Sequence, residues 1–186
     1  MDFICPKGHP VQDTYENWRK KHECPTCSKV AAKASIRNKI PEANPNVYRI
    51  LALDAATETT GYSIYDNKQL VAYGTYTVNY TNDSTARINQ MKHWLDGVCR
   101  KCKPNAIGIE GIQYQQQRGV KTFQTLANLQ GVLLDYCYEN QDKYTYGVAA
   151  SSTWRSALGL NNADQRENAK QKAQSWVKLM FGVSAT

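Results

Sequence analysis

The chain has 186 residues, which is enough for one ordinary domain with its own hydrophobic core and a small additional module. Its 23 Lys and Arg residues outnumber its 16 Asp and Glu residues, and the net charge of +7 favours a polyanionic partner or an anionic membrane surface. No stretch approaches the roughly 18 apolar residues of a membrane span, and the first residues lack the pattern of a secretory signal, so we expect a soluble cytoplasmic protein.

The beginning of the chain carries cysteines and histidines at the spacings of a zinc site. They form a C-x3-H pair followed by a C-x2-C pair and are Cys5, His9, Cys24 and Cys27. Two such pairs can place four ligands around a tetrahedral Zn²⁺, and His22 is an alternative to His9 as the fourth ligand. The competing interpretation is that these are ordinary buried residues. The spacing favours zinc over this interpretation. The segment also has few aliphatic side chains from which to build a core without a metal.

Composition divides the chain into two parts. Residues 1–40 form the zinc finger-like module, whose basic, Ala-rich stretch 29–39 predicts a short helix that either contacts a nucleic-acid backbone or is simply solvated. Residues 41–48 contain two prolines and several turn-forming residues, so we interpret them as a linker. Residues 49–186 then form the main domain.

Beyond the linker, short apolar runs alternate with helical patterns. The predicted strands are residues 49–53, 61–65, 70–80, 106–110 and 144–149. The predicted helices are residues 84–103, 122–141 and 166–181. Ser84 is the expected N-cap of the first helix, and Pro104 follows its end. The order βββαβαβα predicts an α/β fold, with a mixed five-stranded sheet and flanking helices.

Two acidic residues stand directly after apolar strands. Asp54 follows the first predicted strand and Glu110 closes the fourth. A carboxylate at such a place loses hydration unless it is paired or binds a cation. Ligands of α/β proteins collect at the carboxyl ends of strands, so both acids can face one crevice if these strands are neighbours. The pattern therefore predicts a shared metal site.

Three stretches of the main domain carry a family resemblance. They are ILALDAATETTGYSI at residues 50–64, AIGIE at 106–110 followed by TLANLQG at 125–131, and VAASSTWR at 148–155 followed by Leu158 and Gly159. Together they resemble RuvC-like Holliday junction resolvases of the phage and prophage type, which have the RNase H-like fold. No single stretch would be decisive alone.

The resemblance implies a metal-dependent endodeoxyribonuclease, a homodimer that cuts two strands of branched DNA in a bacterium or a phage-infected bacterial host. It assigns Asp54 and Glu110 as catalytic metal ligands, and their oxygens suit Mg²⁺ or Mn²⁺. Family members carry one or two further aspartates after a segment similar to residues 179–186. This chain ends there, so we expect the domain to lack its C-terminal acidic segment.

Several side chains are candidates for contacts with DNA. In the family, an aromatic residue three positions after the second acid stacks on an unpaired base; that position is glutamine here, and Tyr114 is the nearest aromatic. Arg118 and Lys121 are placed to contact phosphates. The resemblance also puts Lys170 near the acids, and Arg155 is a further candidate. Each of these side chains could instead be an ordinary surface residue.

Two other functions compete with the nuclease. A non-catalytic protein that binds branched nucleic acid through a disarmed nuclease fold would suit the missing terminal acids. An actin-like ATPase or sugar kinase would suit the stretch from Leu53 to Gly61, which looks like the first phosphate loop of that superfamily, but the chain lacks the length and the second loop that such proteins need. Substituting Asp54 distinguishes a nuclease from a non-catalytic binding protein, because only a nuclease would lose an activity.

Overall fold

The computed structural model describes residues 2–4, 10–12, 39–79, 81–113, 119–159 and 166–183. Near the beginning of the chain, β1 (Asp2–Ile4) and β2 (Pro10–Gln12) pair as a small antiparallel sheet. The main domain contains a five-stranded sheet in the order β5-β4-β3-β6-β7. Its strands are β3 (Arg49–Asp54), β4 (Thr59–Asp66), β5 (Gln69–Thr77), β6 (Ala106–Gly111) and β7 (Thr145–Ala150).

The direction of the strands changes at the centre of the sheet. β3, β4 and β5 form an antiparallel meander, whereas β6 and β7 run parallel to β3. The parallel pairs are connected through helices, α3 (Ser84–Cys102) before β6 and α4 (Gly119–Glu139) before β7. This arrangement confirms the mixed five-stranded sheet with flanking helices that the sequence predicted.

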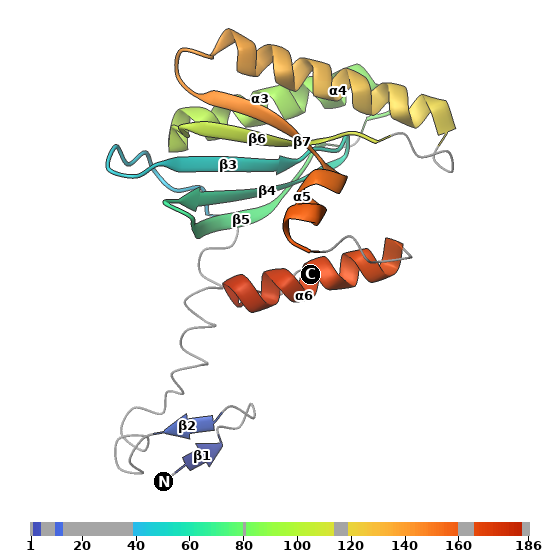
Figure 1. The fold of residues 1–186 in the computed structure, drawn as a ribbon. Coiled ribbons are helices and arrows are strands. Elements are labelled where there is room, and N and C mark those ends of the chain that lie inside the picture. Colours follow the sequence, from blue (N-terminus) through green and yellow to red (C-terminus); the bar gives the residue numbers. More distant parts are fainter. Residues whose placement is uncertain are drawn as a thin grey trace.

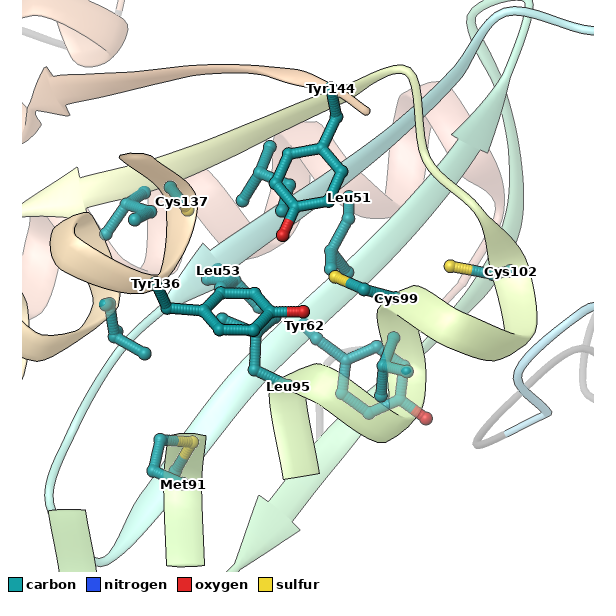
Figure 2. Close-up of a cluster of buried hydrophobic side chains, with 14 of the residues drawn as sticks. Leu51, Leu53, Tyr62, Met91, Leu95, Cys99, Cys102, Tyr136, Cys137 and Tyr144 are labelled. Atoms are coloured by element: carbon teal, nitrogen blue, oxygen red, sulfur yellow. The ribbon is translucent and has the colours of Figure 1, made fainter. Parts of the chain in front are cut away.

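The core lies between one face of the sheet and the helices α3 and α4, which Figure 1 shows together on one side of the sheet. Residues alternate between the faces of β3, so that Leu51 and Leu53 point into this core. Figure 2 shows them beside Leu95 of α3 and Tyr136 of α4. Asp54 therefore belongs, by the same alternation, to the opposite face.

The boundaries of α3 differ slightly from those expected. Asp83, not Ser84, is the N-cap: its carboxylate Oδ1 accepts a hydrogen bond from the backbone N–H of Thr85 at 2.8 Å. An aspartate caps a helix at least as well as a serine, and its charge suits the helix N-terminus. At the other end, Lys103 adopts a left-handed conformation with φ of 44°, and Pro104 follows.

Two helices follow the sheet. α5 (Ser151–Ala157) begins directly after β7 and was not predicted from the sequence, whereas α6 (Arg166–Phe181) matches its prediction. The ring of Phe181 lies 5.8 Å from that of Tyr65 on β4, which places α6 against the face opposite α3 and α4 (Figure 1). Within the described part of the chain, no helix is long and apolar enough to cross a membrane.

A buried arginine secures the start of β3. Arg49 is only 3% exposed, and its guanidinium forms two hydrogen bonds with the carboxylate of Asp66, at 2.6 and 2.7 Å. The same side chain donates to the backbone carbonyls of Glu42 at 2.7 Å and of Cys102 at 2.8 Å. The arginine thus joins the segment that enters the sheet, the end of β4 and the end of α3.

Candidate active site

The sheet brings Asp54 and Glu110 side by side. β3 and β6 are parallel neighbours, and Leu53 pairs with Ile109 in their register, so the next residue on each strand is one of the two acids. Both carboxylates lie on the sheet face opposite the α3 and α4 core, Asp54 exposed and Glu110 half-buried. The sequence-based prediction that these acids share one edge of the sheet agrees with this register.

The turn after Asp54 is held by a buried hydroxyl. Thr60 has no exposed surface, and its Oγ1 accepts a hydrogen bond from the backbone N–H of Ala56 and donates one to the carbonyl of the same residue, both at 3.1 Å. These bonds satisfy the turn between β3 and β4 with a side chain instead of a neighbouring strand. Asp54 is therefore the last residue of β3 and directly precedes a turn that Thr60 holds.

Glu110 receives a hydrogen bond from a tryptophan. Nε1 of Trp154 donates to Oε1 of Glu110 at 3.1 Å. Burial raises the pKa of the Glu110 carboxyl, and this hydrogen bond opposes the increase. The negative charge of Asp54 raises the pKa further, while the positive charge of Arg155 lowers it. A divalent cation between the two acids would relieve their repulsion, because it stabilises both ionised carboxylates.

The end of β6 packs closely against β7 and α4. Gly111 pairs with Ala150, the last residue of β7. A side-chain carbon added at Gly111 would lie 3.1 Å from Cγ1 of Val148, so the side chain of Val148 would have to move by a few tenths of an ångström. On the α4 side, Oε1 of Gln130 accepts a hydrogen bond from the backbone N–H of Ile112 at 2.9 Å. The chain directly after Glu110 is thereby held by both β7 and α4.

The candidate DNA contacts fall at different places. Arg155 lies beside the acids, half-buried, with its guanidinium carbon 5.2 Å from the centroid of the Trp154 ring. Lys121 is exposed in the first turn of α4, and Lys170 is exposed on α6. Tyr114 and Arg118 lie outside the described residues.

The donor set of the site suits a hard cation. Asp54 and Glu110 offer carboxylate oxygens, the ligands that Mg²⁺ and Mn²⁺ prefer. Among the described residues, no group of three or more His, Cys, Asp or Glu side chains gathers around one point. The predicted zinc ligands lie outside the described part of the chain and are Cys5, His9, Cys24 and Cys27.

Sequence reasoning missed two residues of the site. A large aromatic residue next to a strand, such as Trp154, usually fills the core. Instead, Trp154 is half-buried and bonded to Glu110. Thr60 gave no signal, because it lies just before the predicted strand 61–65. Trp154 contacts a residue that is distant along the chain, and Thr60 contacts the backbone of a turn. Hydrophobic periodicity reveals neither contact.

No family model matches the chain. In sequence it is similar to the crossover junction endodeoxyribonuclease RuvC of Syntrophomonas wolfei, with 30% identity over 90 residues, which are 46% of this chain and 51% of that protein. The chain therefore spans about half the length of the curated relative that it matches.

The fold is similar to that of solved RuvC structures. RuvC of Thermus thermophilus in complex with a Holliday junction substrate matches with a TM-score of 0.57 and 12% identity, over 74% of this chain and 80% of that one. A second structure of RuvC from Thermus thermophilus matches with a TM-score of 0.56 and 12% identity, over 74% and 82% of the two chains. The main domain thus has the same fold as these RuvC structures.

Proposed function

We propose that the chain is a metal-dependent, structure-selective endodeoxyribonuclease that hydrolyses phosphodiester bonds in branched DNA, such as Holliday junctions. The observation that carries the proposal is the pair of carboxylates, Asp54 and Glu110, side by side at the carboxyl ends of parallel strands in a RuvC-like fold. The similarity to a bacterial crossover junction endodeoxyribonuclease supports the same activity.

Asp54 and Glu110 would hold Mg²⁺ or Mn²⁺. When bound, such a cation lowers the pKa of water and offsets negative charge on a phosphodiester. Asp54 is the last residue of β3, and Glu110 accepts a hydrogen bond from Trp154, so the sheet and α5 position the two carboxylates. Arg155 adds a positive charge next to the acids, where a phosphate could accept its hydrogen bonds.

Other parts of the proposal rest on the sequence. Lys121 and Lys170 would contact the phosphates of the substrate. Tyr114 and Arg118, in the loop after β6, would also contact the substrate. The protein would act as a homodimer in the cytoplasm of a bacterium or of a phage-infected bacterial host. The spacing of cysteines and histidine in the first 27 residues supports a Zn²⁺ site in a separate module.

The test is cleavage of a labelled four-way DNA junction in Mg²⁺ or Mn²⁺, with linear duplex as the substrate control. We expect paired, symmetric nicks in the junction. Chelation of the metal and the substitution Asp54→Asn should each abolish them, because both remove the cation from the site. Asp135→Asn is the matched control, since Asp135 is an exposed carboxylate on α4, away from the carboxylate pair.

The outcomes separate the two main functions. Nicking that survives in Asp54→Asn would refute the proposed role of the carboxylate pair. Tight binding of the junction without cleavage in either metal would instead identify the chain as a non-catalytic protein that binds branched DNA.

A further inference from the structure

Trp154 reaches the carboxylate pair from a third element of the fold. It is the fourth residue of α5, while the acids belong to β3 and β6. Its Nε1 lies 3.1 Å from Oε1 of Glu110. An indole N–H can only donate, and a carboxylate oxygen only accepts, so Trp154 is the donor and Glu110 the acceptor. The hydrogen bond occupies Oε1 and leaves the other oxygen of Glu110 outside it.

The backbone around this contact is short and paired. Ala149 on β7 is the register partner of Glu110, and Trp154 is only five positions further along the chain. α5 begins with Ser151, whose side chain is buried. The guanidinium of Arg155 lies over the indole ring, 5.2 Å from its centroid. The indole is thus held both by its helix and by a cation on its ring.

Packing alone does not account for this tryptophan. Among the described residues, the hydrophobic core and the side chains packed against it include Trp94 but not Trp154. Trp94 stacks on Tyr76, with the ring centroids 4.8 Å apart and the planes 8° from parallel. Trp154 is half-buried at the edge of the carboxylate pair, where its polar N–H has a partner and its ring remains partly open.

We propose that Trp154 is a positioning residue, whose N–H fixes the carboxylate of Glu110 so that its other oxygen and Asp54 bind one divalent cation. This inference rests on the proposed function, because it concerns the same cation site. Groups that orient a metal ligand through a hydrogen bond commonly change metal affinity by about 10- to 100-fold when they are removed. The loss of this single N–H should therefore weaken cation binding without removing either ligand.

The experiment replaces Trp154 with 3-benzothienylalanine, which keeps the shape of the ring system and exchanges the N–H for sulfur. The affinity of the full chain for Mn²⁺ is measured by electron paramagnetic resonance, without DNA. We expect an increase in the Kd for Mn²⁺ of about 10-fold or more. Trp154→Phe should give the same direction. The same replacement at Trp94, which packs against the core, is the matched control and should leave the Kd unchanged.

A second measurement detects the hydrogen bond itself. In a ¹H–¹⁵N spectrum of the metal-free chain, Glu110→Gln should shift the indole N–H signal of Trp154 and leave that of Trp94 in place. A Trp154 signal that does not respond overturns the inference. So does Mn²⁺ binding that survives the benzothienyl replacement but is lost in Asp54→Asn. Absence of Mn²⁺ binding by the unsubstituted chain would overturn the proposed function and this inference together, which distinguishes the two failures.

Discussion

Burial controls the ionisation of three thiols in the main domain. Cys99 and Cys102 on α3 and Cys137 on α4 are free and enclosed in the core (Figure 2). Burial raises the pKa of Cys99 to about 12 and the pKa values of Cys102 and Cys137 to about 11, from an ordinary value of 9.0. Because the thiolate is the reactive form, these cysteines should be inert at neutral pH.

The raised thiol pKa values predict a loss of stability at alkaline pH. Above pH 9 the unfolded chain releases thiol protons that the folded chain retains, so the free energy of unfolding falls as pH rises from about 9 to 12. Below pH 9 this contribution is fully present. Burial also raises the pKa values of Tyr136 and Tyr144, which add to the same trend.

Urea unfolding between pH 7 and 10.5 measures this effect. Cys137→Ala should lose less stability over that range than the unsubstituted chain, since it removes one of the titrating groups. An equal pH slope in the two proteins would contradict the prediction. Iodoacetamide provides an independent check, because peptides containing the three thiols should become labelled only after unfolding.

The acids of the site could be predicted from the sequence, and their partners could not. Asp54 and Glu110 each end a run of apolar residues, and this local pattern indicates a carboxylate at a strand end. The contact of Trp154 with this site could not be predicted, because its N–H donates to Glu110, which lies 44 residues away along the chain. Such a contact depends on β7 pairing with β6 and on a short helix after it, which no local pattern encodes.

At the scale of the elements, one ion pair connects three parts of the main domain. The guanidinium of Arg49 is buried, and its hydrogen bond to Asp66 raises its pKa further, so it stays charged. Its other donors reach the carbonyls of Glu42 and Cys102. A buried charge is tolerated only while such partners remain, so the strand, the helix end and the entering segment depend on one another.

The substitution Asp66→Asn should strongly destabilise the main domain. It leaves the buried Arg49 guanidinium without a carboxylate, and breaking a buried pair in this way costs about 3 to 5 kcal/mol. The free energy of unfolding in urea measures the loss. Asp135→Asn is the control: Asp135 faces Lys92 at 3.9 Å on the surface, and such pairs contribute about 1 kcal/mol or less. Equal losses in the two variants would contradict the prediction.

Most elements followed from the hydrophobic periodicity of the sequence. Helix α6 has the expected bounds, and β3, α3 and β6 differ from them by one residue at one end. α5 was missed because seven residues with three Ser or Thr among the first three positions and no strong apolar period do not predict a helix. The strand β7 and the contact with Glu110 stabilise it instead. The N-cap of α3 was misplaced by one residue, because Asp83 and Ser84 are both good caps.

At the scale of the whole molecule, the net charge of +7 bears on association with DNA. Lysines that neutralise phosphates release counterions, so affinity falls as salt rises. We expect log Kd for a four-way junction to increase linearly with log [KCl], and Lys121→Gln to reduce the slope by about one unit. Lys143→Gln is the control, because Lys143 precedes β7, at the opposite end of that strand from the acids. A slope of zero for the unsubstituted chain would contradict electrostatic binding.

The hydrogen bond from Arg49 to the carbonyl of Glu42 also indicates where a dye or a surface can be linked to the main domain. Ala43 is exposed beside this anchor, at the start of β3, and Asp54 lies at the far end of that strand. Six strand residues span about 17 Å, at about 3.3 Å per residue. A dye or a surface linkage placed at Ala43 would therefore leave the carboxylate edge facing solution. Immobilised protein prepared in this way should bind DNA as the free protein does.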